Sequence, residues 1–132
     1  MKRLYLLGDA EVCDHIAELT RFLSYDEVHR GAEAPAKLSR EDDVVVAMRQ
    51  PSRGRELLAR VLGAGDPGYL GLVAPENEAM IALLKLSADR FAKARLDRIS
   101  APAGHSIGAT TAGELAIAVA AELIASHRRV PD

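Results

Sequence analysis

A group of polar side chains in the middle of the chain could bind an oxyanion. Arg49 and Arg53 carry guanidinium groups, and Ser52 between them supplies a hydroxyl. All three follow an apolar run and lie at the start of a helical pattern, so the free backbone N–H groups of a helix start would lie beside them. The same side chains are also typical of an ordinary solvated helix start, because arginines are usually exposed. Phosphate binding by these residues is therefore a hypothesis with a plain structural alternative.

A second candidate site is a glycine-containing loop in the last third of the sequence. Gly104 and Gly108 could adopt positive φ angles or let another group approach the backbone closely. His105, between them, could act as a general base or a metal ligand, or could simply be exposed. Thr111 and Glu114 have the spacing of a capping box, in which each side chain accepts a backbone N–H at a helix start. We predict that the fold itself orders this loop, which is either part of a ligand site or an ordinary turn before a helix.

The first loop of the chain is acidic. Gly8 ends an apolar run, and Asp9 and Glu11 follow it. The two carboxylates could form an acid/base pair or a metal site, or they could favour the positive end of a helix dipole. They would repel a pyrophosphate, and the methyl group of Ala10 would crowd its approach, so we predict that NAD(P) binds weakly or not at all. Cys13 is predicted to be a small buried thiol.

Apolar runs that alternate with amphipathic helical patterns must position these residues. The alternation predicts an α/β fold, namely a small, doubly wound, mostly parallel sheet with helices on both faces, as in Rossmann-like domains. Ligands bind such sheets beyond the carboxyl ends of the strands, where residues 8–11, 49–53 and 74–77 would meet and the loop at 104–111 could join them. We expect strands at residues 4–7, 43–48 and 68–73, a weaker strand at 25–28, and helices near residues 12–23, 51–62, 75–86, 87–99 and 112–127.

The two strands at 43–48 and 68–73 are predicted to be parallel neighbours in the interior of the sheet. Both runs are apolar without interruption over most of their length, and residues 44–46 are three consecutive valines. A strand of that character needs cover on both faces, which only interior strands of a parallel sheet receive.

Composition limits the classes of function. The 132 residues suit a single domain over residues 1–132, and a net charge of −2 without any Trp argues against a nucleic-acid-binding surface. One Cys cannot form an internal disulfide, which suits the reducing cytoplasm. No apolar run has the length of a signal-peptide core or a membrane span, so we predict a cytoplasmic protein without a membrane partner.

Several of these segments together resemble the XdhC/CoxI family, accessory proteins that handle the molybdenum cofactor for xanthine dehydrogenase and related hydroxylases. The similarity is to the carboxyl-terminal Rossmann-like domain of that family and extends over most of residues 2–126. Residues 102–109, Pro-Ala-Gly-His-Ser-Ile-Gly-Ala, resemble the family motif P-x-G-L-x-I-G-A. Residues 114–122 are similar to the E-I-A-x-S-I-x-A-E pattern that follows it, and residues 68–72 are similar to the Y-[IV]-G-x-[IL] strand.

The sequence also departs from the family pattern. The family loop G-A-G-H reads Gly-Asp-Ala-Glu at residues 8–11, which removes a glycine and adds two carboxylates. The basic segment G-S-R-[RK]-K reads Ala-Pro-Glu-Asn-Glu at residues 74–78, and T-H-[DN] reads Met-Arg-Gln at residues 48–50. The amino-terminal domain that is usual in the family is not found in this sequence. We therefore expect a divergent, stand-alone Rossmann-like module.

The resemblance implies a chaperone-like protein rather than an enzyme. Such a protein would hold the molybdenum cofactor (molybdopterin) or help to deliver it to a xanthine dehydrogenase-type hydroxylase, its client. Two alternatives stay open: an NAD(P)-dependent oxidoreductase that uses the first loop, and a decayed Rossmann module whose surfaces act in protein assembly. The oligomeric state is also open, with a homodimer among the candidates. No residue is assigned as catalytic or as a metal ligand, and the implied cofactor-binding positions are Gly8, Arg49, Ser52, Arg53, Gly104, His105 and Gly108.

Overall fold

The computed structural model describes residues 1–8, 10–48, 51–104 and 108–128, with only the backbone for residues 51 and 52. Within these ranges the chain forms a five-stranded sheet in the order β2-β1-β3-β4-β5, and every neighbouring pair is parallel. The strand order reverses at β1 and β3, which confirms the predicted doubly wound α/β fold. The strands are β1 (Arg3–Leu7), β2 (Glu27–Gly31), β3 (Asp42–Ala47), β4 (Tyr69–Val73) and β5 (Ile99–Ser100).

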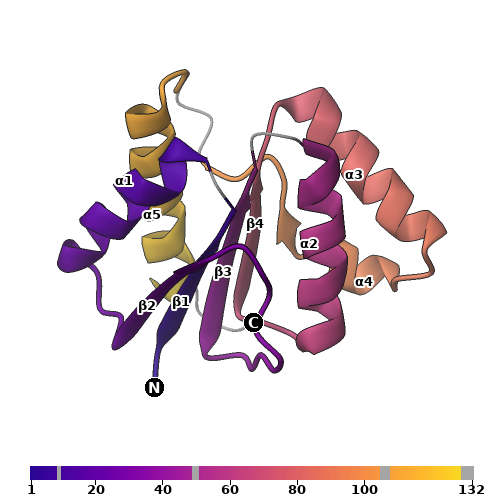
Figure 1. Cartoon of the computed structure of the whole chain (residues 1–132), viewed down its shortest axis with the longest axis horizontal. Coiled ribbons are helices and arrows are strands. Elements are labelled where there is room, and N and C mark those ends of the chain that lie inside the picture. Colours follow the sequence, from indigo (N-terminus) through magenta and orange to yellow (C-terminus); the bar gives the residue numbers. More distant parts are fainter. Residues whose placement is uncertain (9, 49–50, 105–107, 129–132) are drawn as a thin grey trace.

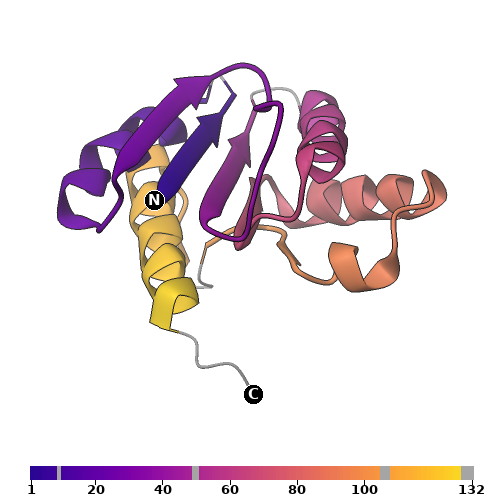
Figure 2. The same cartoon turned by 90° about the horizontal axis from the view of Figure 1, so that it is seen from below.

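Helices cover both faces of the sheet (Figures 1 and 2). One layer consists of α1 (Glu11–Leu19), which a 3₁₀ turn at Thr20–Phe22 follows, and α5 (Ala112–Arg128). The other layer consists of α2 (Pro51–Ala64), α3 (Glu76–Ala88) and the single-turn helix α4 (Lys93–Leu96). In the part of the chain that the structure describes, none of the helices has the length and apolar character needed to cross a membrane.

Strand β3 lies at the centre of the core. All six of its residues are buried; Val44 and Val46 belong to the core under α2 and α3, and Val45 belongs to the core under α1 and α5. Burying each of these valines contributes roughly 1.5–3 kcal/mol of hydrophobic free energy. Strand β4 pairs with β3 from Asp43↔Tyr69 to Ala47↔Val73. This pairing confirms that the two apolar runs are parallel neighbours inside the sheet.

The weaker strand is shifted from its predicted position. It occupies Glu27–Gly31 rather than residues 25–28, and it is an edge strand that pairs only with β1 in the described sheet. Its acidic first residue is accommodated because Glu27 accepts a hydrogen bond from Arg3 Nε at 3.0 Å. Charged side chains are common on edge strands, where they disfavour pairing with another chain.

The helix predicted over residues 87–99 is wrong for most of its length. Helix α3 continues to Ala88, and the chain then leaves helical geometry at Arg90, which has a φ of 70°. Only Lys93–Leu96 returns to a helix. Ile99 lies in β5 instead, where it is in register with Leu70. A strand of two residues has too few side chains to show an alternating apolar pattern, so periodicity could not reveal it.

Candidate functional site

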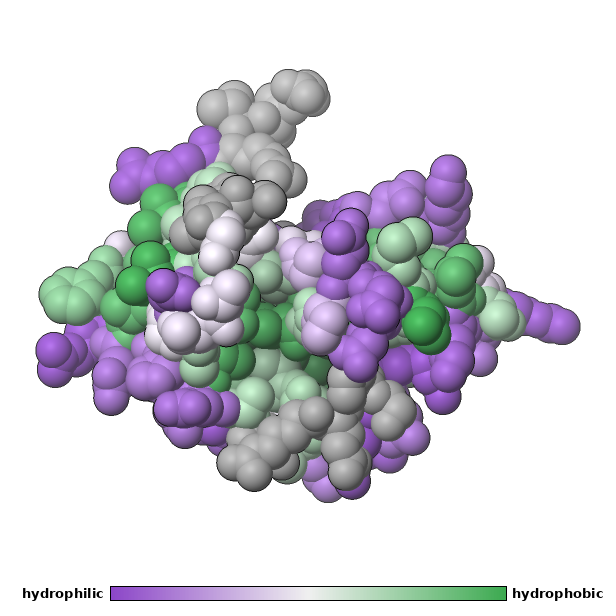
Figure 3. Space-filling view, turned by 90° about the horizontal axis from the view of Figure 1, so that it is seen from above, coloured by the Kyte–Doolittle hydropathy of each residue, from purple (hydrophilic) through white to green (hydrophobic). Residues whose placement is uncertain are grey.

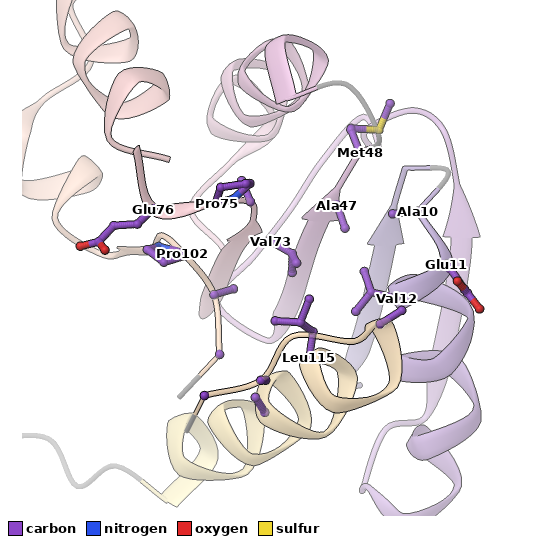
Figure 4. A pocket seen from close by; sticks show the side chains of 17 residues that line it. Ala10, Glu11, Val12, Ala47, Met48, Val73, Pro75, Glu76, Pro102 and Leu115 are labelled. Atoms are coloured by element: carbon purple, nitrogen blue, oxygen red, sulfur yellow. The ribbon is translucent and has the colours of Figure 1, made fainter. Parts of the chain in front are cut away.

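A cavity of about 810 Å³ opens beyond the carboxyl ends of the central strands. It lies where the strand order reverses, which is where doubly wound sheets bind ligands. Figure 3 looks onto this end of the molecule, and apolar residues gather around the hollow between the two helical layers. Figure 4 shows side chains from several loops and from α5 around the cavity. Most of the residues that line it are small or apolar: Ala10, Glu11, Val12, Ala47, Met48, Val73, Ala74, Pro75, Glu76, Pro102, Ala103, Gly104, Gly108, Ala109, Ala112, Leu115 and Ala118.

The described walls of this cavity are apolar, with small side chains predominating. Glu11 and Glu76 are the carboxylates in the described lining, which includes no Lys or Arg. They lie in the first turns of α1 and α3, where an acidic side chain favours the helix dipole. Both point away from the centre of the cavity in Figure 4. The walls therefore suit a largely apolar or flat aromatic group.

Gly8 shapes the first loop by packing against the end of β3. It has a φ of 119°, and a Cβ added to it would lie 1.9 Å from the carbonyl oxygen of Ala47. Its N–H donates to the carbonyl of Gly31 at 2.9 Å, and its own carbonyl accepts from the Arg30 guanidinium at 2.8 Å. Because Gly8 has no side chain, its backbone can pack closely against β3 at Ala47, a residue that lines the cavity.

The two glycines of the late loop differ in what they require. Gly104 has a φ of 106°, and a Cβ added to it would lie 3.2 Å from the Cβ of Ala118 on α5. Gly108 has a φ of 78°, but an added Cβ would meet no atom of the described residues within 4 Å. Gly104 is therefore constrained by both backbone geometry and packing, and Gly108 by backbone geometry alone.

The capping box at the start of α5 is confirmed. The N–H of Glu114 donates to the Thr111 hydroxyl at 3.1 Å, and the N–H of Thr111 donates to the Glu114 carboxylate at 3.2 Å. The N–H of Thr110 donates to the same carboxylate oxygen at 3.1 Å. The backbone hydrogen bonds from Thr110 and Thr111 lower the pKa of Glu114 below its ordinary value of 4.5.

Among the predicted site residues, the structure brings Gly104 and Gly108 into the lining of the cavity and places Gly8 behind it. Arg53 lies in the first turn of α2, where it is exposed and does not line the cavity. Ser52 is the second residue of the same helix, and its side chain lies outside the described part. Arg49 and His105 lie outside the described residues, and so does Asp9 of the acidic loop. The rest of the predicted convergence is confirmed, because residues from the first loop, the loop after β4 and the late loop share one cavity.

Cys13 and Glu11, which the sequence also offers as candidates, make local contacts within the fold. The thiol of Cys13 is buried and donates to the carbonyl of Leu7 at 3.8 Å, as predicted for a small buried side chain. The carboxylate of Glu11 lies 3.5 Å from Nε2 of His15, one turn along α1. Among the described residues, no three His, Cys, Asp or Glu side chains are grouped in a way that could hold a metal ion.

Sequence reasoning missed a polar junction behind the late loop. One oxygen of Glu122 on α5 accepts hydrogen bonds from the hydroxyls of Tyr69, at 2.9 Å, and Ser100. Its other oxygen accepts from the N–H of Gly104 at 2.8 Å. Burial raises the pKa of Tyr69, and the neighbouring Glu122 charge raises it further. The three partners come from separate elements, so no spacing in the sequence could have indicated the group.

A second missed cluster lies at the opposite end of β3. The side chain of Asp43 is 1% exposed. Its carboxylate accepts a hydrogen bond from the Tyr25 hydroxyl at 2.6 Å, and the same carboxylate oxygen lies 2.6 Å from Nε2 of His127. Burial and the Asp43 charge raise the pKa of Tyr25. The cluster ties the end of α5 to the start of β3 and is a structural contact, because the cavity lies beyond the other end of the strand.

The comparisons with known proteins agree with this architecture. A family model described as the XdhC Rossmann domain matches residues 4–123. A curated protein of Escherichia coli (strain K12), YqeB, is 27% identical over an alignment 153 residues long, which includes 98% of this chain and 28% of YqeB. A crystal structure of a xanthine dehydrogenase from Bacillus halodurans superposes with a TM-score of 0.73 at 19% identity, covering 96% of this chain and 43% of that one. The chain thus spans less than half the length of either protein.

Proposed function

The chain belongs to the family of XdhC Rossmann domains, and on that premise we propose that it is an accessory protein of a xanthine dehydrogenase-type system. In this proposal it binds the molybdenum cofactor in the cytoplasm and passes it to a client hydroxylase. The family match over residues 4–123 supports the proposal. The likeness to a structure described as a xanthine dehydrogenase is consistent with it, although at 19% identity that likeness concerns the fold alone.

The observation that carries the proposal is the cavity at the carboxyl end of the sheet. Its volume of about 810 Å³ is within the range of pockets that bind small molecules and cofactors. Small apolar side chains such as Ala103, Ala112 and Val73 would cover the flat fused rings of a pterin. In this proposal the walls cover the faces of the rings, and the loop that carries Gly104 and Gly108 forms one of those walls.

The phosphate of the cofactor would need a different kind of contact. We propose Arg49, Ser52 and Arg53 for it, because in the sequence they lie between the end of β3 and the first turn of α2, and a helix start favours an anion. The phosphate would then lie outside the described lining of the cavity, to which Arg53 does not belong. The cofactor supplies its redox chemistry only within the client hydroxylase. A carrier has to bind it, keep water from its rings and release it, and the apolar walls serve the first two tasks without any covalent step.

A second candidate function, protein assembly without a bound cofactor, is favoured by one observation. Large apolar side chains are exposed on two helices: Met80, Ile81 and Leu84 on α3, and Ile117 and Ile124 on α5. Leu84 is 69% exposed, and the other four are each about half exposed. Side chains of this kind are frequent at protein interfaces. In an assembly protein, a partner protein or a second copy of the chain would cover them.

Anaerobic titration distinguishes these functions. Calorimetry with molybdenum cofactor released from a purified hydroxylase, and separately with NAD⁺ and NADP⁺, would be carried out on the full chain. We expect saturable binding of the molybdenum cofactor only. Binding of a nicotinamide dinucleotide only would favour the oxidoreductase, and binding of neither would favour the assembly module.

A further inference from the structure

One side of α5 lines the cavity, and the next residue along that side, Glu122, lies outside the lining. Leu115 and Ala118 face the cavity, and Glu122 follows Ala118 by four residues, which places it one turn further along the same side of the helix. Glu122 is absent from the lining of this cavity and instead borders a separate polar hollow of about 630 Å³ next to Tyr69 and Ser100. Its carboxylate therefore lies behind the wall of the proposed ligand site.

That wall is held from two sides. The N–H of Ala103 donates to the carbonyl of Leu72 on β4 at 2.7 Å, and the N–H of Gly104 donates to Glu122 on α5 at 2.8 Å. Gly104 also packs closely on Ala118, because a Cβ added to Gly104 would lie 3.2 Å from the Cβ of Ala118, which is tighter than an ordinary contact. The loop thus bridges the sheet and α5, and Glu122 is the side chain that fixes it to the helix.

We propose that Glu122 is a positioning residue for the ligand site. It sets the separation between residues 102–104 and α5, and with it the shape of the cavity, without touching the ligand. The part of this inference that concerns a ligand rests on the proposed function; the part that concerns the loop does not.

The chemistry of the junction explains why a carboxylate stands there. Glu122 meets three donors, the N–H of Gly104 and the hydroxyls of Tyr69 and Ser100, and an ionised carboxylate is purely an acceptor. An alanine would leave a backbone N–H and a buried hydroxyl without their partner. A glutamine could point its oxygen at the N–H of Gly104, because the two hydroxyls can rotate to accept from its NH₂ group.

The loop part is tested by amide hydrogen exchange on the ligand-free protein. In Glu122→Ala we expect the Gly104 amide to exchange about tenfold faster or more, given the usual strength of a hydrogen bond to a charged group. Amides of β3 serve as the reference for global stability and should keep their protection. Glu122→Gln should restore slow exchange at Gly104, and Glu56→Ala, which removes an exposed carboxylate on α2, should behave like the parent.

The ligand part is tested by anaerobic calorimetry of the same variants with the molybdenum cofactor. We expect Glu122→Ala to weaken binding by about tenfold or more and Glu122→Gln by less than about threefold. Should Glu122→Ala not fold, Glu122→Asp replaces it, because its shorter side chain cannot reach all three donors. Parent-like exchange at Gly104 together with parent-like affinity in these variants would overturn the inference. If the parent itself fails to bind the cofactor, the proposed function is wrong, and the exchange data still decide the role of Glu122 in the loop.

Discussion

Two glycines of the late loop look alike in the sequence but are required for different physical reasons. Gly108 has a φ of 78°, and no atom of the described residues lies within 4 Å of where a Cβ would stand, so we expect a side chain there to cost backbone strain rather than a steric clash. We expect Gly108→Ala to lower the free energy of unfolding by roughly 1 kcal/mol. Gly63→Ala is the matched control, because Gly63 has equally open space but lies inside α2, where alanine should stabilise by roughly 0.5–1 kcal/mol. Chemical denaturation of both variants measures this, and equal effects of one sign would refute the assignment.

The hydroxyl of Tyr25 should contribute to stability through Asp43. Tyr25→Phe removes a 2.6 Å hydrogen bond to a carboxylate that is 1% exposed, and we expect it to cost about 1–3 kcal/mol in the free energy of unfolding. Tyr5→Phe provides a matched control, since Tyr5 stacks on His29 through its ring, which phenylalanine keeps. A Tyr25 variant as stable as the Tyr5 variant would mean that the Tyr25 hydroxyl contributes nothing to stability through Asp43.

At the residue scale, the sequence predicted what depends on near neighbours. The capping box of Thr111 and Glu114 and the burial of Cys13 beside an apolar helical stripe follow from spacings of a few residues. The partners of Glu122 and Asp43 are up to 84 positions away, so only the folded chain brings them together. Arg53 shows the same limit, because its place beside a strand end predicts a site residue, yet it lies outside the cavity lining.

Among the elements, the start of α5 should be sensitive to acid. The folded pKa of Glu114 is lowered, so its contribution to stability is present above its ordinary pKa of 4.5 and is lost as the pH falls through the lower folded value. Glu114→Gln keeps the shape but not the charge. The difference in free energy of unfolding between parent and variant should be present at pH 7 and shrink below pH 4.5. A difference that stays constant down to the acid range would contradict this account of the cap.

An element is predictable from the sequence when it is several residues long and buried on both faces of the sheet. Strands β3 and β4 were located correctly because both are apolar over several residues and are covered on both faces. The segment between α3 and β5 was not, because its structure depends on tertiary contacts. There the Arg95 guanidinium donates to the carbonyls of Leu62 and Gly65, and Ile99 pairs with Leu70. Local apolar periodicity contains no information about such contacts.

The molecule as a whole should bind nicotinamide dinucleotides poorly. A pyrophosphate would have to bind at the start of α1, where Glu11 brings negative charge and the backbone at Gly8 is packed against Ala47 rather than open to a ligand. We expect no saturation by NAD⁺ or NADP⁺ at micromolar concentrations in calorimetry. A micromolar Kd, which corresponds to about −8 kcal/mol of binding free energy, would contradict this expectation.

The central claim, that the cavity at the carboxyl end of the sheet holds the molybdenum cofactor, is tested most directly by filling it. Ala109 lines the cavity, and Ala94 is exposed on α4 and does not line it. Anaerobic calorimetry would compare cofactor binding by the parent, Ala109→Trp and Ala94→Trp, with unfolding curves to confirm that all three are folded. We predict that the parent and Ala94→Trp bind with similar Kd values, and that Ala109→Trp binds about tenfold more weakly or not at all. Equal binding by all three proteins, or no binding by the parent, would contradict the claim.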